Sequence, residues 1–288
     1  MKISYDPEID ALYTKLEARL SARTVHHVHT VLGACLSAAV RKGVLVSNPV
    51  KRADPPAPGD NDAGRVLEQE QLASLLASLR SSTLYPIAAV AAFTGARRNE
   101  ILALRWSDLN TAEKTLAIRR SLEETKAHGV RFKEPKTARG VRIITIDENL
   151  VSLLMAERQR YLRLAAGVGE ADDVDLSLVK LPDDALMFPS PAIGANFDFA
   201  RPRSSRGLTK EFVRRAGRLG FAGLRLHDLR ATHETLLLDA GVPVHVVAAR
   251  CGHDPAVLLR VYAKRTRKAD ESAAAVIGAL SQAVLLAT

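Results

Sequence analysis

Four separated segments of the chain each carry a cation, a proton carrier or a nucleophile. In the first, Arg97 follows Thr94-Gly95, where we expect a helix to break. Its planar guanidinium could bind two oxygens of one phosphate group. Glu100, three residues further on, could hold that guanidinium in place. Taken alone, however, an exposed Arg–Glu pair on a helix surface is the commoner arrangement and contributes little stability.

A lysine and a histidine–arginine pair make up the second and third segments. Lys136 lies in the turn before a strand expected at residues 141–146, and a lysine there could donate a proton, although solvated hairpin lysines are far commoner. His227 and Arg230 are three residues apart and so share one face of a helix. Such a pair suits a phosphate, because the imidazole moves protons and the guanidinium stabilises charge. His233 is interpreted as a residue that makes structural hydrogen bonds.

The fourth segment contains Cys251-Gly252-His253 and, nine residues after His253, Tyr262. A tyrosine hydroxyl, with an ordinary pKa of about 10, is a poor nucleophile unless bases and cations surround it. In isolation, a tyrosine at the end of a helix is usually a packing residue. The histidines at positions 26, 27 and 29 could suggest a metal site. Their spacing is not that of a ligand pair four residues apart, so we expect no metal.

The composition narrows the class of protein. The 288 residues include 41 Lys and Arg against 32 Asp and Glu, a net charge of +9. This excess suits a polyanionic partner, because neutralised phosphates release counterions, but it also fits a merely basic protein. Cys35 and Cys251 lie far apart, which argues against a disulfide framework or zinc site. With no signal-like segment or membrane-length apolar run, we expect a soluble, cytoplasmic protein without membrane contact.

Residues 53–64 are rich in proline, glycine and aspartate and are interpreted as a linker. Before the linker, the pattern predicts a helix near residues 6–20 and another, capped by Thr24, that ends near Gly43. Two or three helices are few for an independent domain. We therefore expect a partial helical domain over residues 1–52, the linker, and a main domain over residues 65–288.

The main domain is predicted to be mostly helical. Residues 115–122 and 141–146 are rich in β-branched residues and predict one small antiparallel sheet, with turns between the strands. Another helix should be capped by Thr209. The remaining helices are expected at residues 67–79, 84–93, 99–104, 149–164, 226–240, 243–250 and 255–262. The fold class is therefore mostly α with a small antiparallel β-sheet.

Taken in order, the four segments resemble the tyrosine recombinase (phage integrase) family. The shared signature is an arginine in a TGxR…E context, a hairpin lysine, HxxR, GH and a tyrosine nine residues on. This resemblance runs from about residue 64 to the end and implies the family's catalytic core. Residues 21–49 also look like the second half of the family's core-DNA-binding domain.

The resemblance implies a role for each residue of the signature. Arg97, supported by Glu100, and Arg230 would bind the non-bridging oxygens of the scissile phosphate. Lys136 would protonate the departing 5′-oxygen. His227 would assist proton transfer at the tyrosine, and His253 would donate a hydrogen bond to the phosphate.

Tyr262 would then attack the phosphorus and form a 3′-phosphotyrosyl link, with no cofactor required. The partner would be double-stranded DNA, bound by a homotetramer on paired sites. An accessory directionality factor could be a further partner. The reaction would integrate or excise a mobile element.

Three features leave alternatives open. Cys251 and Ala231 stand where the family commonly has leucine and histidine, and both look tolerable. The segment before Ser21 is short for a full core-binding domain, as in a short family member, a remnant or a truncated chain. The alternatives are therefore a DNA-binding remnant or regulator that no longer recombines, and a relaxing enzyme like type IB topoisomerases. Residues 269–286 could pack on a neighbouring subunit or on their own domain.

Overall fold

The computed structural model describes residues 7–55, 57, 65–134, 140–169, 171–191 and 197–262. The chain divides into two compact units, Met1–Ala63 and Gly64–Thr288. In the described residues, no helix is both long enough and apolar enough to cross a membrane.

The first unit contains α1 (Pro7–Glu17), α2 (Ala22–Arg41) and the short 3₁₀ helix η1 (Pro49–Arg52). Its small core is built from Tyr13, Val25 and Ala53. The prediction that Thr24 caps α2 was wrong. The cap is Ser21, whose hydroxyl accepts a hydrogen bond from the Thr24 backbone, because α2 begins one turn earlier than its apolar pattern indicates.

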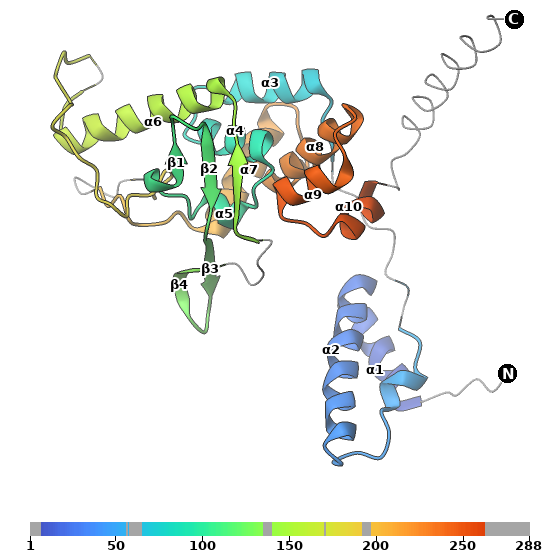
Figure 1. The fold of residues 1–288 in the computed structure, drawn as a ribbon. Coiled ribbons are helices and arrows are strands. Elements are labelled where there is room, and N and C mark those ends of the chain that lie inside the picture. The colour runs from blue at the N-terminus through green and yellow to red at the C-terminus, as the bar shows by residue number, and fades with distance from the viewer. Residues whose placement is uncertain are drawn as a thin grey trace, which may run out of the picture. The chain divides into compact units, whose positions relative to one another are not determined.

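The second unit is organised around α4 (Tyr85–Thr94), which is apolar on all sides and almost entirely buried (Figure 1). Helices α3 (Gln69–Leu79), α6 (Glu148–Ala166) and α8 (Leu226–Asp239) pack against it. The last helices are α9 (Val244–Cys251) and α10 (Pro255–Tyr262), and α9 contacts both α8 and α10. Apart from α7 (Ser205–Arg218), the helices predicted at residues 67–262 are present, and their ends either match the prediction or shift by up to three residues.

Helix α7 (Ser205–Arg218) begins earlier than predicted. Its cap is Ser204, whose hydroxyl accepts from the Gly207 backbone, so the prediction of Thr209 as the cap was wrong. Thr209 lies inside the helix and donates its hydroxyl hydrogen bond to the Ser205 carbonyl. A threonine hydroxyl can either cap a helix or donate to a backbone carbonyl oxygen inside it. The sequence around Thr209 therefore does not determine which role it has until the start of the helix is known.

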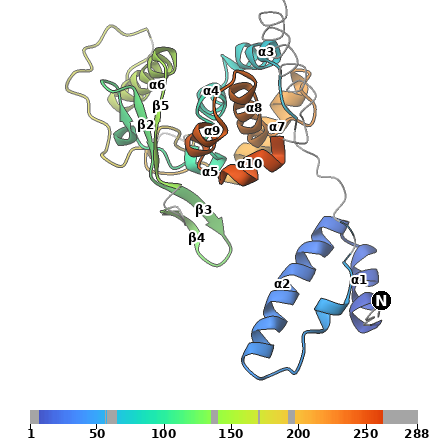
Figure 2. The same cartoon turned by 45° about the vertical axis from the view of Figure 1, so that its right-hand side comes forward.

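The strands form two sheets rather than the single one predicted. In the first, β1 (Leu109–Asn110), β2 (Thr115–Ile118) and β5 (Arg142–Thr145) are antiparallel in the order β1-β2-β5. The second is a hairpin of β3 (Ser121–Thr125) and β4 (Gly129–Lys133), which projects beyond the first sheet (Figure 2). The sequence prediction treated β4 as turn because this strand is largely exposed and lacks a clear apolar alternation. The mostly helical fold class with small antiparallel sheets is confirmed.

Candidate active site

The end of α4 determines where the first segment lies. Gly95 ends the helix in the left-handed conformation, with φ of +64°. A Cβ atom at this position would lie 2.7 Å from both Cys251 Sγ and His233 Cδ2. Glycine is therefore required both by the backbone conformation and by the space available. The turn places Arg97 at the start of the short helix α5 (Arg98–Ile101).

Glu100 lies between two guanidinium groups. Its carboxylate accepts from Arg97 Nη1 at 2.8 Å and from Arg142 Nη2 at 2.8 Å, and also from the Arg97 backbone N–H at 2.8 Å. Burial alone would raise the pKa of the Glu100 carboxyl, but these bonds, led by the one from Arg142, lower it below its ordinary value. Sequence reasoning missed Arg142, which β5 brings to Glu100.

Arg230 is almost fully buried, with 1% of its surface exposed. Its Nη1 donates to the Gly95 carbonyl oxygen at 2.5 Å, and its Nε lies 3.1 Å from Glu234 Oε1. Its Nη2 and its Nε are both buried and have no hydrogen-bond partner among the described residues, so the contact with Glu234 is an ion pair without hydrogen-bond geometry. A buried guanidinium with an unused N–H group suits an anion that arrives from outside, because burial without a partner is costly.

The fourth segment lies against the first and third. Gly252 ends α9 in the left-handed conformation, and its carbonyl oxygen accepts from Arg97 Nη2 at 2.7 Å. The next residue, His253, is partly exposed, and its Nε2 lies 2.9 Å from Glu234 Oε1. Contacts through two glycine carbonyls and two carboxylates therefore bring Arg97, Arg230 and His253 together.

His227 lies in the first turn of α8 and is exposed. It lines an open pocket of about 420 Å³ together with Arg97, Arg98, Asn99, Ser121, Thr209, Arg225 and Leu226. Loss of hydration, and secondly the charge of Arg230, lower the pKa of His227, while Asp228 and Glu234 act against them. A neutral imidazole at this pocket could accept a proton. Arg97 and His227 thus face one pocket.

His233 and Arg250 connect α8 and α9 to the end of α4 through hydrogen bonds. The Nδ1 atom of His233 donates to the Ala92 carbonyl oxygen at 2.8 Å, while its Nε2 accepts from Arg250 Nε at 3.2 Å. Arg250 also donates to the carbonyl oxygens of Thr145 and Phe93. Burial, and then the Arg250 charge, lower the pKa of His233 to about 4, so the ring is neutral. Sequence reasoning missed Arg250.

Two of the expected site residues are described only in part or not at all. Lys136 lies outside the described residues. Tyr262 is the last residue of α10, and its side chain lies outside the description. The helix that carries Tyr262 starts two residues after His253, and the Asp254 side chain accepts from the Ala256 backbone at its start.

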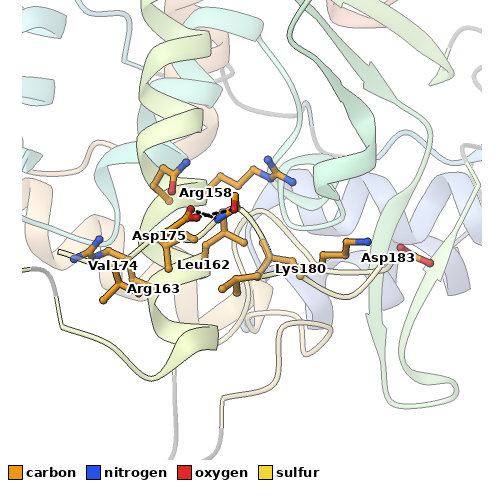
Figure 3. Close-up of a pocket in the computed structure, with 12 residues that line it drawn as sticks. Arg158, Leu162, Arg163, Val174, Asp175, Lys180 and Asp183 are labelled. Carbon is orange, nitrogen blue, oxygen red and sulfur yellow. Dashed lines mark hydrogen bonds between the residues drawn. The ribbon is translucent and has the colours of Figure 1, made fainter. Parts of the chain in front are cut away.

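Two other observations bear on ligands. Within the described residues, no group of three or more His, Cys, Asp or Glu side chains is placed to hold a metal ion. His29, of the N-terminal histidine cluster, instead lies 2.5 Å from the Tyr13 hydroxyl. A larger open pocket of about 820 Å³ lies between α6 and residues 174–183 (Figure 3). It shares no lining residue with the His227 pocket.

Comparison with known proteins places this geometry in context. Residues 65–268 match the model described as the phage integrase family. The chain is similar to a protein named "Tyrosine recombinase XerC-like" from Caldanaerobacter subterraneus subsp. tengcongensis, with 25% identity over 271 residues. That alignment covers 88% of this chain and 66% of the relative, so the chain spans slightly less than two thirds of the relative's length.

Solved structures share the fold. The Tn1549 transposon integrase in complex with transposon right end DNA aligns with a TM-score of 0.69 and 21% identity, over 98% of this chain and 86% of that chain. A lambda integrase tetramer bound to a Holliday junction aligns with a TM-score of 0.57 and 16% identity, over 86% of this chain and 63% of that chain. At these identities, the likeness shows a common fold.

Proposed function

Because the chain belongs to the phage integrase family, we propose that it cleaves and rejoins DNA at specific sites through a 3′-phosphotyrosyl intermediate. The observation that carries this proposal is the convergence of Arg97, Arg230 and His253. Two guanidinium groups and an imidazole, with Arg97 lining the same pocket as His227, are suited to stabilise the charge of a phosphoryl-transfer transition state.

In the proposed first step, the Tyr262 hydroxyl oxygen attacks the phosphorus, and the bond from phosphorus to the 5′-oxygen breaks. His227 accepts the tyrosine proton, a role supported by its lowered pKa. Lys136 gives a proton to the departing 5′-oxygen, which leaves as a hydroxyl. The reverse sequence, with a 5′-hydroxyl from another strand as the nucleophile, rejoins the DNA.

The guanidinium groups have different parts in this proposal. Arg230 would present its unpartnered Nη2 to one non-bridging oxygen. Arg97 has 40% of its side chain exposed and lines the pocket, so it would reach the phosphate from the solvent side. His253 would donate a hydrogen bond to the same phosphate.

We also propose the domain roles and the assembly. Residues 1–52 would form a partial core-DNA-binding domain, residues 53–64 a linker, and residues 65–288 the catalytic domain. The lambda integrase tetramer on a Holliday junction supports a homotetramer on paired double-stranded DNA sites. The transposon integrase bound to transposon DNA supports a role in moving a mobile element. A directionality factor would be a further partner.

The proposal is tested by trapping the covalent intermediate. Nicked duplexes with a randomised central segment are incubated with the full chain, and detergent-resistant protein–DNA adducts are recovered and sequenced. The wild-type chain should enrich one site. The Tyr262→Phe variant should bind that site and form no adduct, whereas Tyr85→Phe, which removes a hydroxyl on α4, should behave like the wild type.

Two outcomes would contradict this assignment. An adduct that survives Tyr262→Phe would show that another residue is the nucleophile. Specific binding without any adduct from the wild-type chain would favour the alternative, a DNA-binding remnant or regulator that no longer recombines.

A further inference from the structure

A carboxylate that the expected site does not include lies between two of its members. Glu234 is on α8, one helical turn after Arg230, and has 7% of its surface exposed. Its Oε1 atom lies 3.1 Å from Arg230 Nε and 2.9 Å from His253 Nε2. One oxygen atom is therefore shared by two groups that would bind the same phosphate.

Glu234 carries its negative charge in this position. Burial alone would raise the pKa of its carboxyl, but contact with His253 and the charge of Arg230 lower it below the ordinary value. The Cys251 thiol also contributes a hydrogen bond. Because an isolated buried cation is very costly, this carboxylate is what allows Arg230 to remain charged away from water.

The same contacts fix the orientation of the Arg230 guanidinium. Nη1 donates to the Gly95 carbonyl oxygen, and Nε forms an ion pair with Glu234 at 3.1 Å that does not have hydrogen-bond geometry. Nη2 has no hydrogen-bond partner among the described residues. The hydrogen bond at Nη1 and the charge contact at Nε both favour this orientation of the planar guanidinium. Arg97 has a separate carboxylate, Glu100, so Arg230 and His253 are the two proposed phosphate-binding groups that Glu234 contacts.

We propose that Glu234 is a positioning residue for strand cleavage, which holds Arg230 and His253 so that both face one non-bridging oxygen of the scissile phosphate. This inference rests on the proposed function. It assigns Glu234 no contact with DNA. Its effect should appear in the rate of the cleavage step, because both partners contribute most when charge builds up in the transition state.

The test uses the full chain, the selected nicked duplex and the variant Glu234→Gln, which keeps the shape and removes the charge. The single-turnover cleavage rate should fall by about 10- to 100-fold, since small misplacements in a site have effects of that size. DNA affinity should change little. The matched control is Glu157→Gln, which removes the charge of another largely buried carboxylate, paired with Arg160 on α6 and remote in sequence from the site residues, and should leave the rate unchanged.

A second substrate separates positioning from loss of structure. A methylphosphonate at the scissile position removes one negative charge, so Arg230 matters less there. The Glu234→Gln defect should shrink to about threefold or less on this substrate if Glu234 acts through Arg230. A variant that is merely less well folded would be slowed equally on both. If Glu234→Gln does not fold, Glu234→Asp, which keeps the charge, provides the same comparison.

The cleavage experiments distinguish a failure of this inference from a failure of the proposed function. Suppose that the wild-type chain cleaves, and that Glu234→Gln cleaves each substrate as fast as the wild type or cleaves the phosphodiester faster than the wild type. Glu234 then does not position the site, and the proposed function still stands. If the wild-type chain forms no adduct on any sequence, both proposals are overturned.

Discussion

Lowering the pH from about 7 to about 5 should destabilise the second unit, with a large part of the effect coming from His233. This imidazole is buried, donates through Nδ1 to the Ala92 carbonyl oxygen and accepts through Nε2 from Arg250. A proton added to Nε2 would break the bond from Arg250 and place two positive charges side by side. Burial and that charge lower the pKa of His233 from 6.5 to about 4.

The size of the effect follows from these two pKa values. In the unfolded chain the histidine binds a proton as the pH falls below 6.5, whereas in the folded chain it binds one only near pH 4. The stabilisation is therefore complete above pH 6.5 and is lost as the pH falls through this window. At about 1.4 kcal/mol per pKa unit, the free energy of unfolding should fall by about 2 kcal/mol between pH 7 and pH 5.

The assay is urea unfolding followed by fluorescence of Trp106, the single tryptophan of the chain, which packs against the core of the second unit. The comparison variant is His233→Asn, whose amide can replace the donor to Ala92 but does not titrate. The wild-type free energy of unfolding should fall by about 2 kcal/mol more than that of the variant. His227 is present in both proteins, so its contribution cancels. Parallel pH profiles would refute the reasoning.

Two further predictions concern the backbone turn and the general acid. Gly95→Ala should lower the free energy of unfolding by at least about 2 kcal/mol and slow covalent cleavage, because the added Cβ meets Cys251 and the left-handed backbone is strained. Gly167→Ala, at a similar left-handed helix end with open space, should cost only about 1 kcal/mol; equal costs in the same urea assay would contradict the packing argument. Lys136→Ala should slow cleavage of an ordinary phosphodiester but spare a substrate with a 5′-bridging sulfur, a better leaving group, and equal losses in adduct formation would exclude proton donation.

The order of chemical groups along the chain was the most informative part of the sequence. Arg97 and Glu100 lie one turn apart, so their contact could be predicted from spacing alone. The ion pair of Arg230 with Glu234 has the same kind of signal, at four residues, and could have been found in the same way. The family signature includes Glu100 but no residue at position 234, so the resemblance does not indicate Glu234.

Other contacts had no signal in the sequence. Arg142 is separated from Glu100 by 42 residues and meets it only because β5 pairs with β2. Arg250 and Arg97 bind backbone carbonyl oxygens, and every residue has one, so no residue type marks the partner. The tertiary fold selects these contacts, and they decide where the guanidinium groups point.

The two arginines of the proposed site differ in what their removal would reveal. Without Arg97, Glu100 keeps its bonds to Arg142, so the buried carboxylate remains paired. Without Arg230, Glu234 loses its cation in a buried position and retains only His253 and Cys251, a change that is costly to the fold itself. Variants of Arg97 therefore report on the phosphate, whereas variants of Arg230 report on the phosphate and the fold together.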